Sequence, residues 1–309
     1  MSIVDISRSS KEMKEIIPPI PIDLLQQEID CLPDSCQLTT RSGYEVYLAS
    51  YDQIPYIIQE IGRLRELTFR AVGEGTGKSS DVDDFDKYYK NLFFWDTANR
   101  KVVGGYRMGF GSEIMNNYGI DHFYINSLFD IDQKAHSLLE KSIELGRSFI
   151  IPEYQKKYLP FFLLWQGILR VLISNPEYQY LIGPVSISKF YSKTSKSMIV
   201  AFVKRYFFDE KMGSYFQPKM PFKPLFDKID IDKILDSFAD NKFRNLEKFL
   251  NTISPDHIKV PVLLKQYTKL NAKFLSFNID PNFSFALDGL MLLNIKDLPQ
   301  NIIDLLNDK

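Results

Sequence analysis

The sequence has few of the side chains that build disulfide frameworks and metal clusters. Its 309 residues include two cysteines, Cys31 and Cys36, and three widely spaced histidines, His122, His136 and His257. Two cysteines without a neighbouring cysteine or histidine cluster do not make a zinc site. We therefore expect two free thiols, as in a cytoplasmic protein, and no metal centre.

Long apolar runs and an excess of one charge are also lacking. No run approaches the ~18 apolar residues that span a bilayer, and the polar N-terminus lacks the apolar core of a signal peptide. Lys plus Arg number 38 and Asp plus Glu number 39, a net charge of −1. Nucleic-acid binding is not expected, because it requires a strong basic excess. These absences predict a cytoplasmic protein and leave contact with the inner membrane surface open.

Aromatic and other apolar residues are plentiful. Apolar residues make up 45% of the chain and charged residues 25%, with 24 Phe and 17 Tyr. This is the composition of a globular protein rather than a disordered one. The length suits one large domain or two small ones at ~150 residues each, and it suffices to bury a real core.

Apolar periodicity predicts strands that alternate with helices, which indicates an α/β (α+β) layered fold. Predicted strands cover 44–49, 91–96, 101–108, 142–150, 178–186, 273–279 and 287–295. Predicted helices cover 22–29, 53–69, 134–140, 158–174, 231–250, 261–270 and 302–306. We divide the chain into an N-terminal arm (1–40), a core (41–187), and a helical insertion followed by strands that complete the same domain (188–309).

Two glycine-rich segments look like phosphate-binding loops but have the wrong spacing. The segment 73–79 is one residue short of a P-loop and follows a predicted helix rather than a strand. The segment 107–111 is similar to the glycine loop of acetyltransferases, but it is also one residue short, and no helix is predicted after it. A standard acetyl-coenzyme A site is therefore not expected.

Four short features follow one another in the first half of the chain. They are Arg65 and Phe69 four residues apart on one helix face, the acidic loop 81–86, a strand 102–107 that ends on Arg107, and the Glu144–Arg147 pair in a strand. Taken alone, an acidic loop is usually a solvated helix cap. A Glu–Arg pair is more often a structural ion pair than a catalytic one.

Together, these features resemble the acyl-homoserine lactone synthases and the acyltransferases that make ornithine and glycine lipids. The matching positions are Arg65, Phe69, Asp81, Asp83, Asp86, Val102, Gly104 or Gly105, Arg107, Glu144 and Arg147. The segments 164–168 and 180–186 look like the ornithine-lipid type, and the tail segments 261–267, 277–283 and 287–289 look most like the glycine-lipid enzymes. The resemblance covers about residues 44–295.

The resemblance implies a GNAT-like fold, with a mixed central sheet flanked by helices. It also implies an N-acyltransferase that moves a (3-hydroxy) fatty acyl group from acyl carrier protein to the amine of an amino acid. Glycine is the favoured acceptor and ornithine the second. The acyl-carrier thioester is a co-substrate, and no cofactor is implied.

The acceptor amine must lose a proton before it attacks a thioester, and a carboxylate can take that proton. We expect Glu144 to be this general base, with Arg147 orienting it. The alternative is that Glu144 only positions the amine and that proximity supplies most of the rate. The expected substrate-binding residues are Arg65, Phe69, Asp83, Asp86, Arg107 and Trp165. Asp83 and Asp86 either hold the acceptor's ammonium or, as we slightly prefer, clamp the arginines in a network.

A long acyl chain needs an apolar channel, and the basic segment 189–225 can bind an acidic carrier. The channel candidates, most of which are expected to be ordinary core residues, are Phe69, Phe93, Phe94, Phe149, Phe161, Phe162 and Trp165. The segment holds eight basic and two acidic residues, 8 − 2 = +6. This charge suits carrier docking, anionic headgroups or a solvated face. The carrier-docking candidates are Lys189, Lys193, Lys196, Lys204 and Arg205.

Two other functions remain open at this stage. One is an O-acyltransferase that acts on a lysolipid. The other is a non-enzymatic acyl-binding module that keeps the fold.

Overall fold

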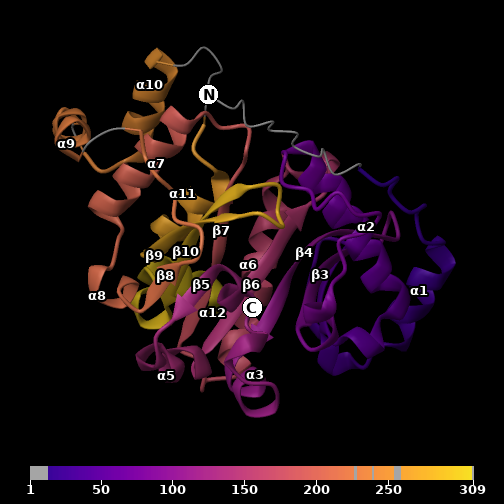
Figure 1. The fold of residues 1–309 in the computed structure, drawn as a ribbon. Coiled ribbons are helices and arrows are strands. Elements are labelled where there is room, and N and C mark those ends of the chain that lie inside the picture. The colour runs from indigo at the N-terminus through magenta and orange to yellow at the C-terminus, as the bar shows by residue number, and fades with distance from the viewer. Residues whose placement is uncertain (1–12, 226–227, 239, 254–258, 308–309) are drawn as a thin grey trace, which may run out of the picture.

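An eight-stranded mixed sheet forms the centre of the computed structural model, which describes residues 13–225, 228–238, 240–253 and 259–307 (Figure 1). Its strand order is β1-β2-β3-β4-β6-β7-β10-β9. The strands are β1 (Gln37–Arg41), β2 (Tyr44–Ala49), β3 (Lys90–Asp96), β4 (Lys101–Phe110), β6 (Ser142–Ile150), β7 (Tyr180–Ile187), β9 (Lys273–Asp280) and β10 (Ala286–Asn294). A small second sheet pairs β5 (Phe129–Ile131) with β8 (Phe216–Pro218).

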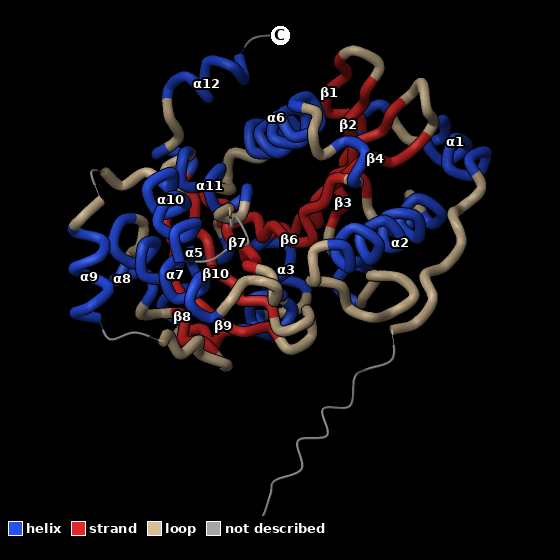
Figure 2. Tube along the Cα trace, turned by 90° about the horizontal axis from the view of Figure 1, so that it is seen from above, coloured by secondary structure: helices blue, strands red, loops and turns tan. Residues whose placement is uncertain are grey.

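Helices cover both faces of the large sheet. Figure 2 shows α2 (Pro55–Ala71) and α6 (Tyr158–Ser174) on opposite sides of the strands. The other helices are α1 (Ile22–Cys31), α3 (Gly111–Asn117), α4 (Tyr124–Leu128), α5 (His136–Glu140), α7 (Lys193–Tyr206), α8 (Glu210–Gly213), α9 (Lys228–Asp236), α10 (Phe243–Ile253), α11 (Val262–Lys269) and α12 (Gln300–Asn307). Because both sheet faces are covered, central strands such as β3 are buried along nearly their whole length.

The strands β6 and β7 are parallel and separate after three residue pairs. They pair only between 142–144 and 180–182. Beyond Glu144, β6 continues beside β4, while β7 continues beside β10. The crossover between them carries α6, as parallel neighbours require. The sheet is therefore open between these two strands.

A bulge in β6 lies next to this opening. Gly105 and Arg107 of β4 pair with Phe149 and Gly146, so β6 has an extra residue there. Arg147 takes the strained φ of +51° at this point. In a regular strand, positions 144 and 147 face opposite sides. The extra residue returns the Arg147 side chain to the face that carries Glu144.

Most predicted elements appear within a few residues of their expected bounds, and 44–49, 142–150 and 158–174 match fully. Several predictions were wrong. The segment 231–250 is two helices, α9 and α10, and only 136–140 of the predicted 134–140 is α-helical. The predicted N-terminal arm extends into β1, which pairs with β2. We also missed the short elements α3, α4, β5 and β8.

A helix does follow the glycines at 107–111, contrary to our expectation. The helix α3 begins directly at Gly111, where a Cβ would come within 1.8 Å of the Leu139 carbonyl oxygen. Gly111 therefore allows close packing of two backbones. Cys31 and Cys36 are free thiols, as expected. Within the described residues, we find no helix with the length and hydrophobicity needed to cross a bilayer.

Candidate active site

A buried arginine from α2 fastens the acidic loop to the sheet. Arg65 Nη1 lies 2.8 Å from Asp86 Oδ1, and Arg65 Nη2 donates to Asn91 Oδ1 at 2.8 Å. Arg65 and Asp86 are almost fully buried. Burial opposes the ionisation of Asp86, but Arg65 and Arg107 outweigh it and lower its pKa to about 2.

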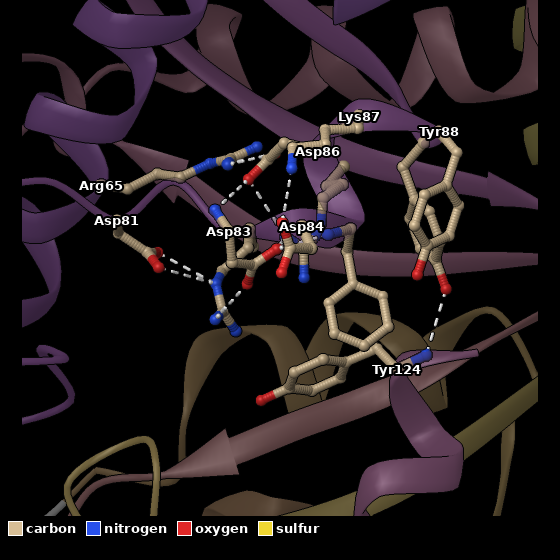
Figure 3. A network of polar contacts seen from close by, with 12 residues as sticks. Arg65, Asp81, Asp83, Asp84, Asp86, Lys87, Tyr88 and Tyr124 are labelled. Atoms are coloured by element: carbon tan, nitrogen blue, oxygen red, sulfur yellow. Dashed lines mark hydrogen bonds and ion pairs between the residues drawn. The ribbon is translucent and has the colours of Figure 1, made fainter. Parts of the chain in front are cut away.

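Two arginines from the sheet reach the same loop. Arg107 Nη1 lies 2.5 Å from Asp83 Oδ1 and 3.3 Å from Asp86 Oδ2. Arg147 Nε lies 2.9 Å from Asp81 Oδ2, and its Nη2 lies 3.3 Å from Asp83 Oδ2. Asp83 thus joins Arg107 to Arg147. Figure 3 shows the loop carboxylates Asp81, Asp83 and Asp86 together with Arg65. The structure therefore brings together five predicted site residues, Arg65, Asp83, Asp86, Arg107 and Arg147, and the matched Asp81, as an ion-pair network.

Glu144, on β6, is buried on the same face of the sheet as Arg147. Its Oε2 accepts hydrogen bonds from the Tyr89 hydroxyl at 2.5 Å and the Tyr124 backbone N–H at 3.1 Å. Its Oε1 accepts from the Ile125 N–H at 2.9 Å. Burial raises the pKa of Glu144 to about 7, although the three donors partly counteract it.

Arg147 does not orient Glu144 as we expected. The guanidinium of Arg147 pairs with Asp81 and Asp83. Its Cζ also lies 5.1 Å from the ring centroid of Tyr124 and 4.9 Å from that of Phe283. The groups that hold Glu144 are Tyr89 and the first turn of α4. Burial raises the pKa of Glu144, and the positive charge of Arg107 only partly counteracts that rise.

Open space lies over Gly146, which stands between Glu144 and Arg147 along β6. Gly146 is two residues from Glu144 and shares its sheet face. A Cβ added at Gly146 would have no atom within 4 Å. Space at a position flanked by buried charged side chains is the room that a small polar substrate requires.

A second set of buried carboxylates lies across the opening, on β9 and β10. Asp288 is paired in register with Ser186 of β7 and accepts its hydroxyl hydrogen bond at 2.6 Å. Asp280 accepts from the Tyr124 hydroxyl at 2.6 Å. Burial and the nearby Asp280 raise the pKa of Asp288 to about 8. Tyr124 therefore contacts both sides of the site, since its N–H also binds Glu144.

Phe69 and Trp165 lie on opposite faces of the sheet. Phe69, on α2, packs edge-on against Phe283, with ring centroids 5.1 Å apart. Phe283 in turn covers Arg147. Trp165, on α6, packs against Tyr267 at 5.5 Å. Trp165 is buried, and its Nε1 has no hydrogen-bond partner in the described part of the chain.

Five of the seven channel candidates are buried residues of the main core, and the other two, Phe161 and Phe162, pack against it; the five are Phe69, Phe93, Phe94, Phe149 and Trp165. Phe93 stacks on Tyr47 and Phe94 stacks on Tyr44, both within the sheet. Both phenylalanines are fully buried.

The predicted carrier-docking residues differ in their solvent exposure and in their ion pairs. Lys189, Lys193 and Lys204 are exposed, whereas Lys196 is partly buried and its pKa is lowered by that burial. Arg205 pairs with Asp236 and lies 3.7 Å from Asp232. The excess of +6 counted within 189–225 omits these two carboxylates, which α9 brings in from outside the segment.

Sequence reasoning missed several residues of the site: Tyr89, Asn91, Tyr124, Gly146, Ser186, Asp280 and Asp288. The sequence could have indicated Asp280 and Asp288, because Asp280 ends an apolar strand and Asp288 lies within one. Tyr89 and Tyr124 left none, because they come from short connecting segments that only the tertiary fold brings to Glu144.

The chain is similar in sequence to known proteins. Residues 64–166 match the acetyltransferase (GNAT) domain family. A glycine N(alpha)-acyltransferase from Bacteroides thetaiotaomicron is 30% identical over 286 residues, which cover 89% of this chain and 83% of that protein. Its counterpart from Phocaeicola vulgatus is 30% identical over 287 residues, covering 89% and 86%.

Among solved structures, the CoA-dependent acyl-homoserine lactone synthase BjaI is 11% identical with a TM-score of 0.42, covering 86% of this chain and 89% of that one. The sequence relationships are the decisive ones, because they extend over almost the whole chain at 30% identity. The chain is therefore an acyltransferase with a GNAT fold, and it belongs to the family of the glycine N(alpha)-acyltransferases.

Proposed function

We propose that this protein transfers a fatty acyl group from a thioester to the amine of glycine, which yields an N-acylglycine and a free thiol. The observation that carries this proposal is the similarity to two glycine N(alpha)-acyltransferases over 89% of the chain. Glycine is small and has both charges, so it suits a buried site that contains both arginines and carboxylates.

The space over Gly146 is our proposed place for the acceptor. Glu144 and Arg147 flank Gly146 along β6. The ion-pair network keeps Arg107 and Arg147 fixed before substrate binds, which reduces the reorganisation that the reaction requires. We therefore assign the network a positioning role.

We propose that Glu144 receives the first proton from the glycine ammonium. The neutral amine then attacks the thioester carbonyl carbon, the carbon–sulfur bond breaks, and the leaving thiolate takes the second proton from nitrogen. A base works best when its pKa lies near the working pH, and the pKa of about 7 for Glu144 meets this condition. Asp288 is a second candidate, because it is buried beside the opening with a pKa of about 8.

The bulge in β6 supplies our proposed oxyanion site. A bulge leaves a residue out of the regular ladder of hydrogen bonds. Beyond Glu144, β6 no longer pairs with β7, so a backbone N–H of the bulged segment that points towards β7 has no strand partner there and is our candidate donor. Such a preorganised donor stabilises the negative charge that develops on the carbonyl oxygen.

For the donor, we propose a (3-hydroxy)acyl thioester on acyl carrier protein. The exposed lysines Lys189, Lys193 and Lys204 support an acidic carrier. Arg205 is a weaker candidate, since Asp236 already neutralises it.

Lipid profiling of a host that lacks such lipids tests the proposed function. Expression of the protein is expected to produce N-acylglycine amides, and expression of Glu144→Gln is expected to produce at least tenfold less. An acyl ester as the new product would favour the O-acyltransferase alternative and contradict the proposal. An ornithine amide would contradict glycine as the acceptor.

A further inference from the structure

Three exposed apolar side chains lie on segments that meet at the end of the sheet where β6 and β7 separate. Val72, Phe190 and Phe285 are exposed by 42%, 69% and 60%. They come from three distant segments: the loop after α2, the segment after β7, and the turn between β9 and β10. A monomeric protein rarely gathers exposed aromatic residues without a partner for them.

Direct contacts join the three segments into one surface. The Ser188 hydroxyl donates to the Val72 carbonyl oxygen, and the Ser284 hydroxyl donates to the Gly75 carbonyl oxygen at 2.6 Å. The ring of Phe190 lies so close to Gly73 that a Cβ there would come within 2.6 Å of it. The loop 72–75 is therefore held between the other two segments.

The turn that presents Phe285 is strained. Ser284 and Phe285 have φ values of +54° and +58°, a region that residues other than glycine rarely adopt. The preceding Phe283 packs into the site against Phe69, while Phe285 points into solvent. Strain that holds an aromatic side chain in water indicates a functional role for that side chain.

Three exposed lysines lie on the segments that carry this surface. Lys189 lies beside Phe190, with its Nζ 5.9 Å from the ring centroid. Lys78, at the end of the same loop as Val72, and Lys193, at the start of α7, are both exposed. The acidic residue of the loop, Glu74, has its pKa raised by burial to about 7, so its charge opposes these lysines only weakly.

The surface also borders the proposed active site. Ser188 follows Ser186 by two residues, and Phe285 precedes Asp288 by three. The proposed product carries a long acyl chain, which is costly to release into water. An apolar and basic rim at this place suits transfer of that product into the interface of an anionic bilayer.

We propose that Val72, Phe190 and Phe285, with Lys78, Lys189 and Lys193 around them, form a surface that binds anionic lipid bilayers and opens the active site towards them. This inference rests on the proposed function for the direction of product release. The apolar side chains enter the interface, and the lysines contact the phosphate headgroups. Binding therefore requires both anionic lipid and the two phenylalanines, and it weakens as salt rises.

Sedimentation with vesicles tests this surface. The full chain is mixed with vesicles of phosphatidylcholine alone, or of phosphatidylcholine with phosphatidylglycerol. We expect binding to the anionic vesicles only, and we expect the double variant Phe190→Ser/Phe285→Ser to bind about tenfold more weakly. The matched control is Ile173→Ser, which removes a side chain of similar exposure, 57%, near the start of β7, and it should bind like the wild type.

Two further measurements separate a loss of vesicle binding from a loss of folding or of catalysis. Thermal unfolding confirms that the variants are folded, and a water-soluble short-chain acyl thioester measures acylation without a membrane. We expect the double variant to retain that activity, so loss of vesicle binding cannot be confused with loss of function. The proposal is overturned if the wild type does not sediment with anionic vesicles. It is also overturned if the double variant binds these vesicles as well as the wild type does, including the case in which that variant has lost only its binding to acyl carrier protein.

Discussion

Glu144 accepts a hydrogen bond from the backbone N–H of Tyr124 at 3.1 Å. Tyr124 therefore connects Glu144 on β6 to Asp280 on β9, because the Tyr124 hydroxyl donates a hydrogen bond to Asp280. The Tyr124 ring also covers Arg147 at 5.1 Å. A change at Glu144 therefore affects both the proposed proton acceptor and the placement of Tyr124.

Replacing Glu144 should remove a titration from the activity profile. If ionised Glu144 is the base, wild-type kcat/KM rises as pH increases through about 7. Glu144→Gln should lower kcat/KM by about 10²–10⁴-fold and abolish this rise. Steady-state rates between pH 5 and 9, an interval chosen to span roughly two units on each side of that pKa, provide the measurement.

Tyr89→Phe is the matched control for that experiment. The Tyr89 hydroxyl stabilises the ionised form of Glu144, so its removal should shift the rise in kcat/KM to higher pH without abolishing it. An unchanged profile in both variants would show that Glu144 is not the base.

Asp288→Asn separates the two candidate bases. If Glu144 takes the proton, this variant keeps the rise near pH 7. If Asp288 takes it, the wild-type rise lies near pH 8 and disappears in Asp288→Asn. Ser186→Ala removes the hydroxyl that donates to Asp288, and in the second case it should move the rise upward.

The fold can be predicted from this sequence better than the site can. The strand at 142–150 and the helix at 158–174 follow from the length and period of their apolar runs, and their predicted bounds match the structure. The short elements α3, α4, β5 and β8 have too few residues to show a period. The break between α9 and α10 was missed although the sequence offers a turn signal there, the neighbouring Asp240 and Asn241.

The arginine–carboxylate network could be expected from the residue types, but its connections could not. Regular alternation places Arg147 on the wrong face, and only the bulge at φ +51° brings it to Asp81 and Asp83. Similarly, the contact between Ser186 and Asp288 depends on a register across 102 residues of sequence. Patterns along the chain carry no information about such a register.

The buried part of the network should dominate stability. Asp86→Ala leaves Arg65 without its carboxylate and should destabilise the fold by about 3–5 kcal/mol. The neighbouring Asp84→Ala, whose side chain is 88% exposed, should leave the midpoint of urea denaturation unchanged. Equal effects of the two substitutions would contradict the assigned network.

Stability should also fall in acid through Asp86. Its pKa in the folded protein, about 2, lies below its ordinary value of 3.8. The stabilisation is therefore complete above the ordinary value and is lost as pH falls through the folded one. Urea unfolding of wild type and Asp86→Asn between pH 2 and 6, a range of about two units on each side of the ordinary value, should converge at the acidic end.

Filling the open space at Gly146 should affect activity more than stability. Gly146→Val places a side chain where a Cβ meets no atom within 4 Å, and valine suits a strand. We expect an unchanged unfolding midpoint and a loss of glycine acylation. As a contrast, Gly111→Ala should destabilise the fold by about 1–3 kcal/mol, because its Cβ overlaps the Leu139 carbonyl. An active Gly146→Val enzyme would show that the acceptor binds elsewhere.

The most direct test of the account is a reaction of the purified protein with glycine and a long-chain acyl carrier protein thioester, followed by mass spectrometry. We predict an N-acylglycine amide with one equivalent of free carrier thiol, and we predict that Glu144→Gln forms at least about 10²-fold less of that amide. Release of the thiol without any amide would contradict N-acylation of glycine. Equal amide formation by the wild type and Glu144→Gln would contradict the role of Glu144 as the base.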